Sequence, residues 1–300
     1  AVTDAPVPPP NTEGIFGFGY VSGSAQCDIT NLVSSSGVVA SDVTGVGTER
    51  YDPAACEYGY DKGIFGYGTG AAVTAVTNLV SNAGVVATDV TGVGTTRYAL
   101  AACGYGYDKG IFGFGNDDSS VVSMTNLVSN AGVVATDTTG VGTARSHLAA
   151  TQYGGDKGIF GFGTTGSNTA ISNLVSNAGV VATDVAGVGT ARKTLAACNY
   201  GGNRDKGIFG YGGTGGDANV KSMTNLVSNA GVVATDTTGV GTPRGETAAC
   251  EYGEDKGIFG FGHDGSFLGM TNLVSNTGVV GTDVAAVGTA RNHLGACSYN

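Results

Sequence analysis

The chain has 300 residues, enough to bury a substantial core, and 54 of them are glycine, against an average share of roughly 7%. A formal net charge of −10, with 14 basic residues spread along the chain, excludes a nucleic-acid-binding protein, because phosphate recognition needs clustered Lys and Arg. No apolar run reaches the roughly 18 residues of a transmembrane helix, so we expect no membrane span.

Residues 1–13, AVTDAPVPPPNTE, hold four of the six prolines. Such a segment favours an extended, polyproline-like arm. Two interpretations of the arm stay open: an inert linker, or a strap that docks on a partner or a neighbouring subunit.

Residues 14–300 contain six copies of one unit. The string GIFG(F/Y)G occurs six times, each time followed by (T/S)NLVS and by GVVATD or a close variant. In the copy at residues 97–142, four apolar stretches (RYALAACGYG, DKGIFGFG, SMTNLVS and VVATDTT) are separated by turns. Glycine this dense disfavours helices. Four antiparallel strands per unit are typical of a propeller blade, so we predict an all-β, six-bladed β-propeller over residues 14–300.

The side chains within a unit suit this architecture. The alanine-rich first strand fits the crowded centre of a propeller. In the second strand, alternation predicts that Phe112 and Phe114 face one neighbour while Ile111, Gly113 and Gly115 face the other.

The chain begins its repeats at the second strand of a unit and ends, at residues 291–300, on a first strand. We therefore expect the C-terminal strand to pair with the N-terminal blade, which closes the ring and removes free sheet edges.

Each unit carries an aspartate and an arginine eight residues apart, with a G-x-G segment between them. We predict a structural network in which each arginine hydrogen-bonds a carboxylate where one blade leads to the next. The alternative is a ring of six arginines that binds an anion at the channel mouth. The residues are Arg50, Arg97, Arg145, Arg192, Arg244 and Arg291, with Asp42, Asp89, Asp137, Asp184, Asp236 and Asp283.

Five of the six cysteines share one position of the first strand, where the remaining unit has Thr151, and Cys27 stands apart. A cysteine that threonine replaces is best interpreted as a small buried residue, so we expect free thiols, which favour assembly in a reducing compartment. No Cys/His spacing typical of zinc and no convincing catalytic set is present. We expect no metal, no cofactor and no enzyme activity.

The copies differ mainly in the loop after the second strand and in the three residues after each arginine. We expect both segments on one face of the disc, and loops on a rigid scaffold commonly carry binding specificity. The candidate binding residues on this variable face are Tyr20, Tyr51, Asp52, Tyr98, Asp117, Asp118, His147, Lys193, Asp217, Lys221, His263, Asp264, Phe267 and His293.

The stretch TARSHLAATQYGGDKGIFGFG, residues 143–163, resembles the kelch repeat in its Arg, its small apolar strand, its Gly-Gly turn and its apolar strand ending in glycine. The resemblance covers all six units and implies a β-propeller of four-stranded blades that acts as an interaction module. The near-identical tandem units also resemble predicted repeat proteins of marine phages and bacteria.

Two functions stay open. The first is a non-enzymatic binding or structural module, a component of a virion or a surface assembly, that contacts a protein partner through the variable face. The alternative is a lectin-like propeller, in which repeated glycan sites raise avidity. The residues leave the localisation unknown, with a virion or a cell surface as the candidates.

Overall fold

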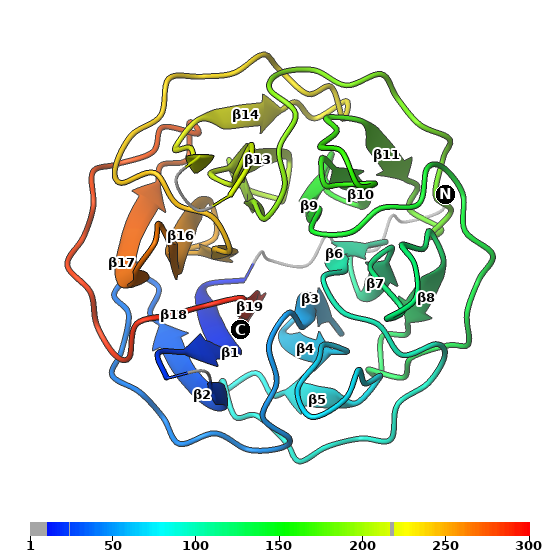
Figure 1. The fold of residues 1–300 in the computed structure, drawn as a ribbon, viewed down its shortest axis with the longest axis horizontal. Coiled ribbons are helices and arrows are strands. Elements are labelled where there is room, and N and C mark those ends of the chain that lie inside the picture. The colour runs from blue at the N-terminus through cyan, green and yellow to red at the C-terminus, as the bar shows by residue number, and fades with distance from the viewer. Residues whose placement is uncertain (1–10, 24, 217–218) are drawn as a thin grey trace, which may run out of the picture.

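The computed structural model describes residues 11–23, 25–216 and 219–300. Within these ranges the chain contains no α-helix, and its strands form six antiparallel sheets arranged around a common centre (Figure 1). This repeated arrangement is propeller-like, and the all-β prediction is confirmed.

Five of the sheets contain three strands each. They are β3 (Ala54–Tyr58), β4 (Lys62–Gly66) and β5 (Thr77–Val80); β6 (Ala101–Tyr105), β7 (Lys109–Gly113) and β8 (Thr125–Val128); β9 (Ala149–Tyr153), β10 (Lys157–Gly161) and β11 (Ser172–Val175); β12 (Ala196–Tyr200), β13 (Lys206–Gly210) and β14 (Thr224–Val227); and β15 (Ala248–Tyr252), β16 (Lys256–His263) and β17 (Phe267–Val274).

The remaining sheet joins the two ends of the chain. Here β1 (Glu13–Val21) pairs with β2 (Ala25–Val33), with the short β18 (Arg291–Asn292) and with β19 (Gly295–Tyr299). The register of β19 on β1 runs from Glu13↔Tyr299 to Gly17↔Gly295. The last strand of the chain therefore occupies, in this sheet, the place that β3 occupies beside β4.

The first strand of each unit lies nearest the centre, as Figure 1 shows for β3, β6, β9 and β19. Each of these inner strands contacts the inner strand of the next unit, and β19 in turn contacts β3. The alanine-rich stretches thus lie where the predicted crowding is greatest, because alanine occupies little space beside a neighbouring strand.

The predicted fourth strand of each unit does not form a strand. In the unit of β5, the segment after the turn is joined to it only by the isolated bridges Val80↔Val86 and Thr77↔Val90. The outer segment has one more residue between these bridges than β5 does, and the Asn78 side chain donates to the Ala87 carbonyl at 3.0 Å. A side chain thus occupies an acceptor that a regular ladder would use, and the prediction of four strands per blade is corrected to three.

The two aromatic residues of the second strand pack against different neighbours, contrary to the alternation expected for them. Phe112 lies 5.2 Å from Tyr67 of the preceding unit, whereas Phe114 lies 5.1 Å from Phe160 of the following unit. The reason is that β7 ends at Gly113 and Phe114 has a left-handed φ of 63°. This conformation interrupts the alternation of a strand.

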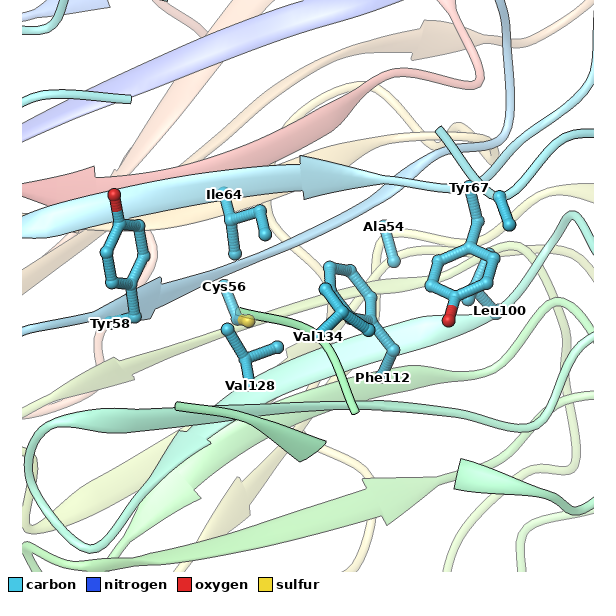
Figure 2. Packing of buried hydrophobic residues seen from close by; sticks show 10 residues of the cluster. Ala54, Cys56, Tyr58, Ile64, Tyr67, Leu100, Phe112, Val128 and Val134 are labelled. Carbon is cyan, nitrogen blue, oxygen red and sulfur yellow. The ribbon is translucent and has the colours of Figure 1, made fainter. Parts of the chain in front are cut away.

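The core lies between neighbouring sheets. Figure 2 shows one such interface, in which Cys56 and Ile64 pack beside Val128 and Phe112 of the next unit. Gly110 permits this approach, because a Cβ atom there would lie 2.5 Å from the Cys56 sulfur. Each fully buried large apolar side chain stabilises the fold by about 1.5–3 kcal/mol.

Candidate functional site

The six repeat arginines are completely buried between neighbouring sheets. The Arg50 guanidinium lies 3.9 Å above the Phe18 ring of the preceding sheet. Its Nε donates to the Tyr67 carbonyl at 2.8 Å and its Nη2 to Asn78 Oδ1 at 2.6 Å. A cation over an aromatic ring, hydrogen-bonded to the next unit, joins the two sheets.

The repeat aspartates accept hydrogen bonds from groups other than arginine. Asp89 accepts from the backbone and hydroxyl of Thr48, the hydroxyl at 2.6 Å, and from Asn78 Nδ2 at 2.8 Å. Partial burial opposes ionisation of Asp89, but these hydrogen bonds outweigh it and hold its pKa below the usual value. We call each set of Arg, Asn, Asp and Thr a seam network.

The aspartate that lies near each arginine is not the one eight residues before it in the sequence, as the spacing had suggested. Where the distance is shortest, Arg97 Nη1 lies 3.8 Å from Asp137, 40 residues further along, and the contact is an ion pair without a direct hydrogen bond. The spacing failed because Asp89 and Arg97 belong to different seams. Burial lowers the pKa of Arg50 to about 10. Since the arginines have no exposed surface, they form no anion-binding ring at a channel mouth.

A different ring of residues surrounds the axis on the variable face. The second residue after each repeat arginine has a left-handed backbone, with φ between 51° and 56°. Its amide donates to the carbonyl of the equivalent residue in the preceding unit, at 2.8–3.3 Å, all the way round. A left-handed backbone at a residue other than glycine destabilises the fold by about 1–2 kcal/mol, and this ring of hydrogen bonds offsets that loss. The mouth ring consists of Asp52, Ala99, His147, Thr194, Glu246 and His293.

One side of the mouth ring holds a charged cluster. His293 Nδ1 lies 2.6 Å from Asp52 and its Nε2 lies 3.2 Å from Glu246, which also accepts from Asn292 at 2.6 Å. Burial alone would lower the pKa of His293, but the two carboxylates outweigh it and raise the pKa to about 10. His293 is therefore protonated at neutral pH. On the other side, burial lowers the pKa of His147.

An aromatic cleft lies beside this charged cluster. The rings of Tyr20 and Tyr51 are 5.2 Å apart, Tyr20 lies 6.3 Å from Phe267, and Phe267 lies 5.3 Å from His263. Together with Glu246, Asn292 and His293 these side chains line a cavity of about 380 Å³. A second cavity of about 140 Å³ lies between His147, Lys193, Glu246 and His263.

The structure brings many of the sequence-predicted residues together. Isolated bridges such as Tyr51↔Thr69 and Gly245↔His263 hold the residues after each arginine against the loop after the second strand. Both variable segments therefore lie on one face. Of the candidates, those that line the described cavities near the axis are Tyr20, Tyr51, Asp52, His147, Lys193, His263, Phe267 and His293.

The other candidates line none of the cavities described for the placed residues. Asp117 accepts from Ser119 and Ser120 and stabilises its own turn. Asp217 lies outside the described residues. The remaining candidates away from the cavities are Tyr98, Asp118, Lys221 and Asp264.

Sequence reasoning missed Glu246 and Asn292. Both follow a repeat arginine within two residues, so the signal was present in the same variable triplets that pointed to Asp52 and His293. The spacing alone did not show that units five and six meet at one side of the axis with the first unit.

No family model matches the chain, and no curated protein matches it significantly. Among the described residues, no helix is long and apolar enough to cross a membrane.

Proposed function

We propose that the chain is a closed six-bladed β-propeller of kelch-like repeats that acts as a non-enzymatic binding module. One observation carries the proposal: the residues that differ between otherwise near-identical units meet at the mouth ring and the adjoining aromatic cleft. The pairing of β19 with β1 and the contact of β19 with β3 support closure of the ring.

A protein partner is the first candidate ligand. Tyrosine and phenylalanine beside a charged cluster match the composition of protein-binding hot spots, in which aromatic anchors contribute most of the affinity. The partner would place a side chain in the cleft between Tyr20, Tyr51 and Phe267, against the carboxylate of Glu246.

A glycan is the second candidate, and the aromatic cleft is the observation that favours it. Sugar rings stack their C–H faces on aromatic side chains and hydrogen-bond to carboxylates and amides, and Glu246 and Asn292 lie beside the tyrosines. Tyr20, Tyr51 and Phe267 come together on one side of the mouth ring, so this candidate predicts one glycan per chain and not the multivalency expected from six copies.

The test compares Tyr20→Ala with Tyr60→Ala on a glycan array and in affinity capture from the source organism. Tyr60 is a 45% exposed tyrosine in the turn between β3 and β4, at the opposite end of the axis, and serves as the matched control. A ligand of the cleft binds the wild type and the Tyr60 variant and is lost from the Tyr20 variant. Equal binding by both variants would contradict the proposed site.

A further inference from the structure

The inner strands present a second, layered surface to the axis of the molecule. In β3, Ala54, Cys56 and Tyr58 are buried between sheets, whereas Ala55 and Glu57 are partly exposed and line axial cavities. The cavity below the mouth ring and the cavity at the far end share the same lining alanines. This alanine collar consists of Ala55, Ala102, Ala150, Ala197, Ala249 and Ala296.

The far end carries polar side chains that differ from unit to unit. Glu251 is 1% exposed and Gln152 is 3% exposed, yet both Glu251 oxygens and Gln152 Oε1 have no hydrogen-bond partner among the described residues. Buried polar groups need hydrogen-bond partners, and these side chains line the axial cavity, where a bound molecule could supply them. The far ring consists of Glu57, Gly104, Gln152, Asn199, Glu251 and Ser298.

The fifth unit adds an arginine to the far ring. Its turn reads YGGNRDKG where the third unit has YGYDKG, and the two extra residues place Arg204 at the axis. Arg204 is 2% exposed, and its Nε lies 3.7 Å from Glu57 and 3.8 Å from Glu251. Its other nitrogens reach the carbonyls of Tyr107 and Tyr60 at 3.5 and 3.4 Å. One guanidinium between two carboxylates leaves the far end a net charge of −1 when both are ionised.

The mouth ring has the same charge. Asp52 and Glu246 carry two negative charges, and the protonated His293 between them carries one positive charge. Lys193 lines the adjoining side cavity and not the axial one. The two axial cavities, of about 120 and 40 Å³, share the alanine collar, and each has acidic side chains at its outer end. We call these cavities and the collar the axial channel. Its charges match a molecule with two cationic ends and an apolar middle.

We propose that the axial channel binds a linear alkyl diammonium ion, with one ammonium group at the mouth ring, the other at the far ring, and the methylene chain in the alanine collar. Residues 52–57 span roughly 16 Å at about 3.3 Å per residue, and ammonium–carboxylate contacts of about 3 Å at each end leave roughly 10 Å. A bond of about 1.5 Å advances about 1.25 Å along an extended zigzag, so this length corresponds to about eight bonds, which is a chain of about seven to eight carbons between the nitrogen atoms.

The chemistry of the collar excludes related cations. Spermidine has the required length, but its central ammonium would lie among six methyl groups, where a charge without a partner is costly. A metal ion is disfavoured, because no group of three or more His, Cys, Asp or Glu side chains in the described ranges is placed to hold one.

The protonation of Glu251 makes the affinity for a cationic ligand depend on pH. Burial, opposed by Arg204 and reinforced by Glu57, raises the pKa of Glu251 to about 8. Asn199, Asp255 and the Cys198 thiol are the other groups that face it. A cationic ligand needs the ionised carboxylate, so its affinity rises between pH 7 and pH 9.

Isothermal titration calorimetry of the full chain with 1,8-diaminooctane at pH 8.5 tests the proposal. We expect one ion per chain, with at least tenfold weaker binding of octylamine, 1,4-diaminobutane and spermidine. Glu251→Gln and Asp52→Asn each reduce affinity at least tenfold. Glu251→Gln also weakens the pH dependence, and the remainder belongs to Glu57, whose pKa is likewise raised by burial. Asp118→Asn, an exposed carboxylate outside the channel, leaves the affinity unchanged.

Equal affinity for octylamine and the diamine would overturn the proposal, as would equal losses in the Glu251 and Asp118 variants. Glu251→Gln preserves side-chain size, and a melting curve for each variant separates lost binding from lost fold. Diamine binding can be separated from partner binding at the aromatic cleft. If both proposals hold, Tyr20→Ala abolishes partner binding and leaves diamine binding intact.

Discussion

The seam networks and the axial rings use repetition in opposite ways. At a seam, Arg50, Asn78, Asp89 and Thr48 recur as the same residue types in every unit, and their polar groups bond mainly to one another. In the mouth and far rings, equivalent positions hold different residues, and their side chains line the axial cavities. A sixfold scaffold thus carries a site without sixfold symmetry. The residues that build the fold and those available for binding are therefore separate sets.

Removal of a seam arginine should have the largest effect. We expect Arg50→Met to lower the free energy of unfolding by about 3–5 kcal/mol, because Asn78 and the Tyr67 carbonyl lose a charged donor in a buried site. Chemical denaturation measures the change. Lys62→Met, at a side chain that is 40% exposed, is the control and should cost within about 0.5 kcal/mol. Similar losses in the two variants would remove the distinction between seam and surface.

A crowded glycine of the interface should rank second. Gly110→Ala places a Cβ atom 2.5 Å from the Cys56 sulfur and 3.0 Å from the Glu57 carbonyl, so we expect a loss of about 1–3 kcal/mol. Adding Cys56→Ala should restore part of that stability, and a double-mutant cycle measures the coupling. Strict additivity of the two substitutions would show that the contact with Cys56 is not the cause.

The charged cluster of the mouth ring should depend on pH. His293 has a pKa of about 10 in the folded chain against 6.5 for an ordinary histidine, so folding favours its protonated form. Its contribution is complete below pH 6.5 and disappears as the pH rises through about 10. We expect His293→Gln to lower the melting temperature at pH 6 and to have little effect at pH 10.5. A loss that is independent of pH would rule out the charge pairing as its cause.

The smallest effect should come from the inner-strand thiols. Cys103→Thr should change stability by about 1 kcal/mol or less, because Thr151 already holds the equivalent position and contacts Gly207 as Cys103 contacts Gly158. Burial raises the pKa of Cys103 to about 12, so this thiol should also resist alkylation in the folded chain. Rapid labelling of Cys103 under native conditions would contradict its placement.

The repeated motifs were sufficient to predict the strands that pack, because apolar alternation and turn glycines are local signals. The fourth strand could not be predicted from pattern alone, since the Asn78 side chain interrupts its ladder through a contact nine residues away. The neighbour of Phe114 was predicted wrongly because its left-handed backbone interrupts the alternation of side chains along a strand. The pairing of Arg97 with Asp137 depends on which sheets adjoin.

The candidate site was predictable in part. The variable residues after each arginine indicated Asp52, His147 and His293, which the mouth ring brings together. Glu57, Glu251 and Arg204 were not predicted, because the alanines of the first strand indicate a crowded centre but do not show that one face of the strand lines axial cavities. That face lines the axis, and the insertion in the fifth unit extends to the same place.

The most direct test of the separation between seam and axis is a matched pair of buried amides. Asn78→Leu and Gln152→Leu both replace an amide with an apolar group of similar size, at side chains of 0% and 3% exposure. We predict that chemical denaturation shows a loss of about 3 kcal/mol or more for Asn78→Leu, which removes one buried hydrogen bond from Arg50 and one from Asp89. For Gln152→Leu we predict a change within about 1 kcal/mol. Equal losses at the two positions would show that the axial residues support the fold as the seams do, and would contradict the account.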